Sequence, residues 1–168
     1  MSLFALLQAG CLGAFVLLLV VAGLQDLRSM HIRNRLSLAV VGVFVAWELV
    51  GLAGGRASIE GLAATLLCAI AIFGIGALAF AAGLLGGGDV KLLSAASLFA
   101  GPAFMLDFLT VTALSGGAMA LAMLAGVSIG PGIPERDGTL RTRLRSGLPY
   151  GPAIAAGGLW VAILHLIA

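Results

Sequence analysis

Two of the seven acidic residues, Asp26 and Asp89, have the surroundings expected of residues that perform chemistry. Each lies at the end of a long apolar run, and ionisable groups at or near membrane depth are costly, so each needs a reason to be present. Two carboxylates that share a site cannot easily both be ionised. One then holds a proton, and the pair can act as general base and general acid on water. This is aspartyl-protease chemistry, which needs no metal or organic cofactor.

The segment Gly86-Gly87-Gly88 precedes Asp89 directly and adds a backbone feature. Glycine can adopt φ > 0 and lets another chain approach closely, so an extended substrate can lie alongside. The alternative is a flexible turn between two helices, and Gly-x-Gly-Asp taken alone favours that interpretation. Whether this Gly-x-Gly-Asp segment indicates a catalytic site therefore depends on the rest of the chain.

The composition is that of a membrane protein. Hydrophobic residues make up 61% of the 168 residues and charged residues 10%, and the mean hydropathy is +1.18. A soluble domain of this size needs far more polar surface. Cys11 and Cys68 lie inside apolar runs, which excludes a disulfide framework or a cysteine metal site. His31 and His165 are expected on opposite sides of the membrane, so they are not expected to share a metal ion. Nucleic-acid binding has no support.

Long apolar runs predict the helices that position these acids. A helix needs roughly 20 apolar residues to cross a bilayer, and the runs 3–24, 36–53 and 62–85 satisfy this. The region 90–129 is interrupted at Gly101-Pro102, which predicts two helices joined by a tight turn. The run 148–168 is the sixth span. Glu48 and Asp107 then fall near outer helix ends, where a structural role is expected.

The basic residues predict the orientation. Six spans with a non-cytoplasmic N-terminus leave only Arg56 of the nine basic residues outside, as the positive-inside rule requires. We therefore expect an all-α, polytopic protein with six transmembrane helices and both termini non-cytoplasmic. It would form one domain over 1–168, with cytoplasmic loops at about 25–35, 86–91 and 130–147. Asp26 and Asp89 then lie at similar depth on the cytoplasmic side.

Three segments, in order, resemble the type IV prepilin peptidase family over nearly the whole chain. They are Asp-Leu-Arg-Ser-Met-His-Ile-Arg-Asn at 26–34, Gly-Gly-Gly-Asp-Val-Lys-Leu at 86–92 and Pro-Tyr-Gly-Pro-Ala at 149–153. In that family one aspartate precedes an Ile-Pro-Asn element and the other lies in Gly-x-Gly-Asp. Asp26 and Asp89 occupy those positions. Arg33 stands where the family usually has Pro, so the turn before the second helix is expected to be less rigid.

The resemblance implies a substrate and a place of action. The substrate would be a pilin-like precursor with an N-terminal transmembrane helix, whose short basic leader is removed at the cytoplasmic face of a prokaryotic inner membrane. Larger family members carry a cytoplasmic region, often with a four-cysteine zinc site, and N-methylate the new terminus. This chain looks like the compact form associated with tight-adherence (Flp-type) pili, and methyltransferase activity is not expected. The oligomeric state stays open.

Three polar residues are secondary candidates for the site. Lys91 either tunes the charge of Asp89 or extends to the cytoplasmic interface. Asn34 ends the first family-like segment. Tyr150 is either an interfacial aromatic anchor or, through its Pro-Tyr-Gly-Pro context, part of the site.

Other functions remain to be separated from proteolysis. Membrane acids also serve as ion or proton sites, so a small proton-coupled transporter is the main alternative. Related halves and acids near mid-membrane are typical of transporters, and neither is evident. A non-catalytic subunit of a pilus or secretion machine would not need either aspartate. Presenilin-type proteases share Gly-x-Gly-Asp, but their other aspartate follows Tyr, where this chain has Gln25.

Overall fold

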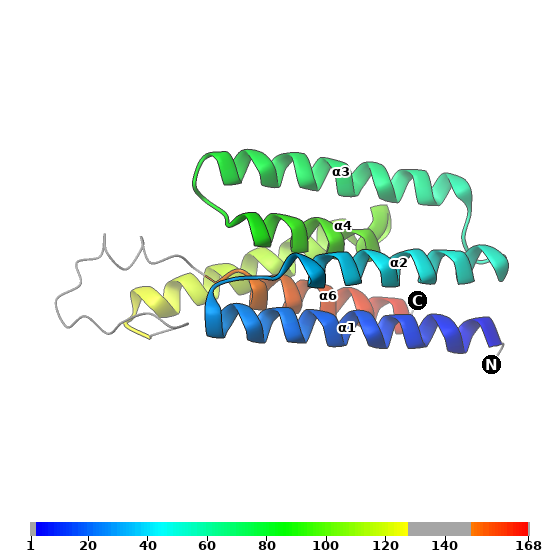
Figure 1. The fold of residues 1–168 in the computed structure, drawn as a ribbon, viewed down its shortest axis with the longest axis horizontal. Coiled ribbons are helices and arrows are strands. Elements are labelled where there is room, and N and C mark those ends of the chain that lie inside the picture. Colours follow the sequence, from blue (N-terminus) through cyan, green and yellow to red (C-terminus); the bar gives the residue numbers. More distant parts are fainter. Residues whose placement is uncertain (1–2, 128–148, 168) are drawn as a thin grey trace.

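The computed structural model describes residues 3–127 and 149–167, and every regular element in these ranges is an α-helix. The predicted loop at 130–147 lies outside the described residues. The helices run roughly along one axis, with the N-terminal and C-terminal ends at the same end of the bundle (Figure 1). They are α1 (Leu3–Ser29), α2 (Asn34–Ala53), α3 (Ile59–Ala81), α4 (Gly87–Leu124) and α6 (Gly151–Ile167).

Helix α4 is broken at the predicted place. Gly101 has φ 52° and ψ −169°, a conformation that favours glycine, and Pro102 cannot donate the next backbone hydrogen bond. Beyond this point the chain runs back, so the second half of α4 passes its green start and ends, in yellow, beyond it (Figure 1). Leu93 from the first half and Leu109 from the second accordingly line one cavity. The two halves therefore form a helical hairpin.

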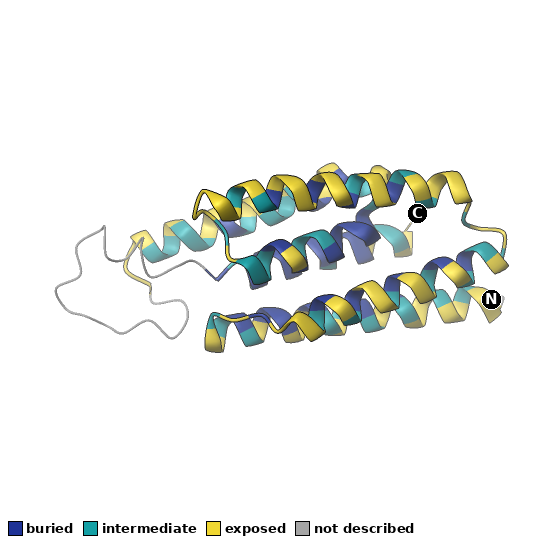
Figure 2. Cartoon of the chain, turned by 45° about the horizontal axis from the view of Figure 1, so that its top comes forward, coloured by how far each residue is buried: buried dark blue, intermediate teal, exposed yellow. Residues whose placement is uncertain are grey.

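The first half of α4 forms the centre of the bundle, because α4 packs against α2, α3 and α6. Its residues from Ala95 to Ala100 are buried, and Figure 2 shows this stretch of α4 in dark blue after a teal start. Phe99 stacks on Phe15 of α1 at 4.0 Å between ring centroids and meets Phe44 of α2 edge-on at 5.5 Å. These rings tie α4 to the first two helices.

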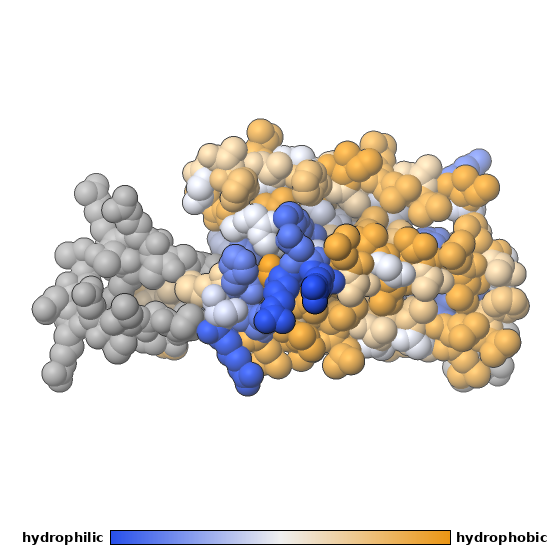
Figure 3. Space-filling model, viewed as in Figure 1, coloured by the Kyte–Doolittle hydropathy of each residue, from blue (hydrophilic) through white to orange (hydrophobic). Residues whose placement is uncertain are grey.

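The outer surface is apolar, as expected for a membrane protein. Four of the described helices, α1 to α4, are long and apolar enough to cross a bilayer, whereas α6 has 17 residues. Hydrophilic residues gather where α1 ends and α2 and α4 begin (Figure 3). The exposed basic residues there are Arg28, Arg33, Arg35 and Lys91.

The helix ends differ from the predicted loops. Helix α1 continues to Ser29 and α4 begins at Gly87, so Asp26 and Asp89 lie in helical turns rather than in loops over 25–35 and 86–91. Hydropathy predicts which residues can lie in lipid, whereas a helix continues as long as its backbone hydrogen bonds do. The bond from Met30 N–H to the Asp26 carbonyl, 2.8 Å long, is the last of α1, and Met30 then turns away with φ 47°.

Close contact between α6 and α4 depends on Gly157. A Cβ atom at this position would lie 2.8 Å from the Phe108 carbonyl oxygen and would overlap the Thr112 hydroxyl. We expect Gly157→Ala to lower the free energy of unfolding by about 1–3 kcal/mol, because the two helices must separate. Thermal unfolding in detergent measures this. Gly10→Ala is the control, since no atom lies within 4 Å of its new methyl group; equal melting temperatures for the two variants would contradict this packing.

Candidate active site

Asp26 is held against the start of α6. Its side chain is 4% exposed, and the N–H of Gly151 donates a hydrogen bond to its Oδ2 at 2.7 Å. A Cβ atom on Gly151 would lie 2.6 Å from the Cβ of Asp26. One turn earlier, a Cβ on Gly23 would lie 3.3 Å from the Cα of Pro152. Two glycines thus let α1 and α6 approach closely enough for a backbone N–H to hold the carboxylate.

Asp89 is the third residue of α4 and is half-buried. Its Oδ2 accepts a hydrogen bond of 3.2 Å from the N–H of Gly86, which satisfies a backbone donor at the start of the helix. This hydrogen bond holds the Asp89 carboxylate against the first turn of its own helix. A negative charge is also favoured there by the helix dipole.

Of the three glycines before Asp89, Gly88 allows the close approach of another segment. None of them has a positive φ, so the freedom expected from the sequence is not used in this conformation. A Cβ on Gly88 would instead lie 3.2 Å from the Cβ of Ile32. Ile32 belongs to the loop between α1 and α2. The absence of side chains therefore lets this loop lie against the start of α4.

These contacts bring Asp26 and Asp89 to the same end of the bundle, although 62 residues of sequence separate them. The two carboxylates are close enough to interact electrostatically. Each accepts a backbone N–H, one from Gly151 and one from Gly86. Two acids held in this way can divide the roles of general base and general acid on one water molecule.

Lys91 and Asn34 form a separate polar contact. The ammonium group of Lys91 donates to Oδ1 of Asn34 at 3.0 Å, which links the start of α2 to α4. Both line a cavity of about 490 Å³ with Ser94 and Leu98, whereas Asp89 lines another cavity with Leu93. Lys91 and Asn34 thus connect two helices beside the acids, and they do not share the Asp89 cavity.

A second cavity, of about 400 Å³, adjoins Asp89. We call it the Asp89 cavity. Leu93, Thr112, Gly117 and Tyr150 are among its lining residues, and Tyr150 is half-buried. Most of the lining is apolar, so an apolar segment can lie beside the carboxylate.

No sequence pattern indicated Thr112, whose buried hydroxyl has no hydrogen-bond partner among the described residues. A threonine in an apolar run has no distinguishing pattern. Gly151 belongs to the family-like segment at 149–153. Its N–H bond to Asp26 could not be predicted, because it depends on the contact of α1 with α6 in three dimensions. Within the described residues, no group of three or more His, Cys, Asp or Glu side chains could hold a metal ion.

The model of the type IV leader peptidase family matches residues 13–121, more than half of the chain, and this range includes Asp26 and Asp89. No curated protein and no solved structure matched the chain.

Proposed function

Because the chain belongs to the type IV leader peptidase family, we propose that it is an aspartic endopeptidase that removes the leader of a pilin-like precursor. Family membership supports a membrane leader peptidase in general terms. One observation carries the aspartic mechanism. Asp26 and Asp89 lie together at one end of the bundle, each bonded to a backbone N–H.

The proposed reaction uses one water molecule. The ionised carboxylate accepts a proton from water while the water oxygen attacks the carbonyl carbon of the scissile peptide. The protonated carboxyl group donates to the carbonyl oxygen as charge develops there. A proton then passes to the amide nitrogen, the C–N bond breaks, and the leader leaves with a carboxylate and the pilin with a free amine. Either aspartate can hold the initial proton in this scheme.

We further propose six spans, with the two halves of α4 each counted as one, and both termini on the non-cytoplasmic side. The start of α1 and the end of α6 lie toward one end of the bundle, and the end of α1 and the start of α4, which contain Asp26 and Asp89, lie toward the other (Figure 1). The exposed basic residues lie beside the aspartates, which supports a cytoplasmic position for that end. Cleavage would then occur at the cytoplasmic face of a prokaryotic inner membrane, where a basic leader is also retained.

The proposed substrate is the precursor of an Flp-type pilin, which carries an apolar helix next to its leader. We propose that residues near the cleavage point enter the Asp89 cavity, with Tyr150 at its wall. Lys91 and Asn34 are proposed to position the start of α2 against α4 through their hydrogen bond. Methylation of the new terminus is not part of the proposal.

Filling the Asp89 cavity should impair cleavage. Gly117 lines this cavity, and no atom lies within 4 Å of a Cβ built on it. We expect Gly117→Leu to lower kcat/KM for the precursor by about 10-fold, the effect of losing roughly 1.4 kcal/mol of substrate binding. The assay is cleavage by purified protein in liposomes. Gly74→Leu on α3, where a Cβ also meets nothing within 4 Å, should cleave like wild type; equal rates for both variants would place the substrate elsewhere.

The general proposal is tested by reconstituting the unaltered chain in liposomes with an Flp-type precursor. Release of the leader at a single peptide bond supports it. Acid-dependent proton flux with an intact precursor would instead indicate a transporter. Neither cleavage nor flux, with a panel of pilin-like precursors, would indicate a non-catalytic subunit.

A further inference from the structure

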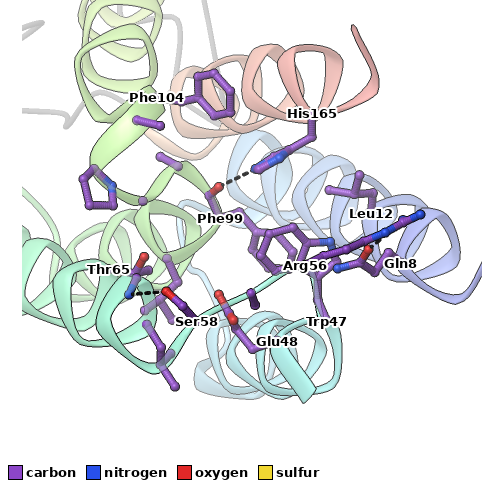
Figure 4. A pocket seen from close by; sticks show the side chains of 18 of the residues that line it. Gln8, Leu12, Trp47, Glu48, Arg56, Ser58, Thr65, Phe99, Phe104 and His165 are labelled. Atoms are coloured by element: carbon purple, nitrogen blue, oxygen red, sulfur yellow. Dashed lines mark hydrogen bonds between the residues drawn. The ribbon is translucent and has the colours of Figure 1, made fainter. Parts of the chain in front are cut away.

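A cavity of about 730 Å³ lies at the end of the bundle opposite the aspartates. Residues at the start of α1 and α3, at the ends of α2 and α6, and at the hinge of α4 line it (Figure 4). The hinge at Gly101 and the C-terminal end of α6 stop short of the ends of α1 to α3 (Figure 1). The cavity therefore occupies the space that the shorter segments leave between the longer ones. We call it the Glu48 cavity.

One wall of the Glu48 cavity is aromatic. The ring of His165 lies 5.2 Å from that of Trp47 and 5.1 Å from that of Phe104, measured between centroids. His165 Nε2 lies 2.8 Å from the Phe99 carbonyl oxygen. Because a carbonyl oxygen only accepts hydrogen bonds, this nitrogen is the donor. The imidazole is thus fixed in place, and the wall presents ring faces and edges to the interior.

Glu48 supplies a carboxyl group with an unpaired oxygen atom. Its side chain is 8% exposed, and its buried Oε2 has no hydrogen-bond partner among the residues that the structure describes. Figure 4 shows the carboxylate pointing into the cavity. An unpaired polar atom in a buried position is costly, and more so for a carboxylate within a membrane protein. A ligand that donates hydrogen bonds and carries positive charge would remove this cost.

A positive side chain also lines the Glu48 cavity. Arg56, from the exposed loop between α2 and α3, lines it and donates a 3.3 Å hydrogen bond to Oε1 of Gln8. A guanidinium group has five N–H donors, so it can hold Gln8 and still contact an anion. The cavity thus offers a carboxylate inside and a guanidinium group toward the exposed loop.

We propose that the Glu48 cavity binds a phosphoethanolamine group, with its ammonium toward Glu48 and its phosphate toward Arg56. The carboxylate and the rings of Trp47 and Phe104 both favour a cation, and arginine favours phosphate. The volume lies within the range of small-molecule sites, roughly 300–1,000 Å³. In the proposed topology the cavity lies near the non-cytoplasmic ends of α1 and α2, where lipid headgroups would be found. A membrane phospholipid or a soluble compound can supply this group, and the proposal does not rest on the peptidase assignment.

The fluorescence of Trp47 provides the test. The chain has two tryptophans, and Trp160 is exposed on α6, so Trp160→Phe leaves Trp47 as the reporter. This protein, in nanodiscs of phosphatidylglycerol, is titrated with free phosphoethanolamine, and in a second series with an increasing fraction of phosphatidylethanolamine. We expect a saturable change in emission. Adding Glu48→Gln should weaken the apparent affinity at least about 10-fold, whereas the exposed control Glu60→Gln should leave it unchanged.

The ligand itself supplies a second test that leaves the cavity unaltered. N-acetylation removes the positive charge from phosphoethanolamine or from the lipid, and it should abolish the response. A response only to the lipid supports a membrane ligand, and a response to the free compound supports a soluble one. No response in either series, an equal response to the N-acetylated compounds, or full affinity in Glu48→Gln would overturn the proposal.

Discussion

Replacing Asp26 or Asp89 by Asn is expected to lower kcat/KM for precursor cleavage by about 10²- to 10⁴-fold, the usual contribution of general acid–base catalysis. Asn matches Asp in shape, and its carbonyl oxygen can still accept the N–H of Gly151 or Gly86. The substitution therefore removes the ionisable group and retains the positioning bond. Rates measured with purified protein in liposomes test this.

The double variant gives further information. If the two carboxylates act on one water molecule, Asp26→Asn with Asp89→Asn should be about as slow as the slower single variant, because groups that act as a unit are not additive. Asp107→Asn is the control, since Asp107 is an exposed acid on the second half of α4 and should cleave like wild type. Losses that multiply in the double variant would contradict a shared step.

Adding one methyl group at Gly151 is expected to reduce cleavage by about 10²-fold. The new Cβ of Gly151→Ala would lie 2.6 Å from the Cβ of Asp26, an atom that cannot rotate away because it is bonded to the backbone. Either α6 or α1 must shift, which disturbs the 2.7 Å bond from the Gly151 N–H. A misplacement of about 1 Å at a catalytic group can cost about this factor.

The same substitution at Gly13 is the control. Gly13 lies on α1, and no atom is within 4 Å of a Cβ built there, so Gly13→Ala should retain full activity. Circular dichroism and thermal unfolding must accompany the rates, so that a folded but slow Gly151→Ala protein is distinguished from an unfolded one. A folded Gly151→Ala protein with wild-type kcat/KM would show that the placement of Asp26 against α6 does not matter for cleavage.

Much of this arrangement could be predicted from the sequence, because lipid imposes strong constraints on a chain. Long apolar runs predicted the helices, and Gly101-Pro102 predicted the break in α4. The number of spans and the positions of the basic residues predicted that Asp26 and Asp89 lie at the same end of the bundle.

Other features could not be predicted because they depend on contacts between helices. Hydropathy does not determine where the last backbone bond of a helix forms, so Asp26 and Asp89 were expected in loops. The contact of Gly88 with Ile32 requires the loop after α1 to fold onto α4. Glu48 was interpreted as a structural residue near the outer end of a span. Its burial and the cavity beside it depend on how the other helices pack around the end of α2.

The most direct test of the central claim is the intact mass of an Flp-type pilin precursor co-expressed with wild type, Asp26→Asn or Asp89→Asn. We expect loss of the leader with the wild-type chain only, while all three proteins accumulate in the membrane to similar levels. Leader removal by both variants would contradict it, because neither aspartate would then be needed for the reaction.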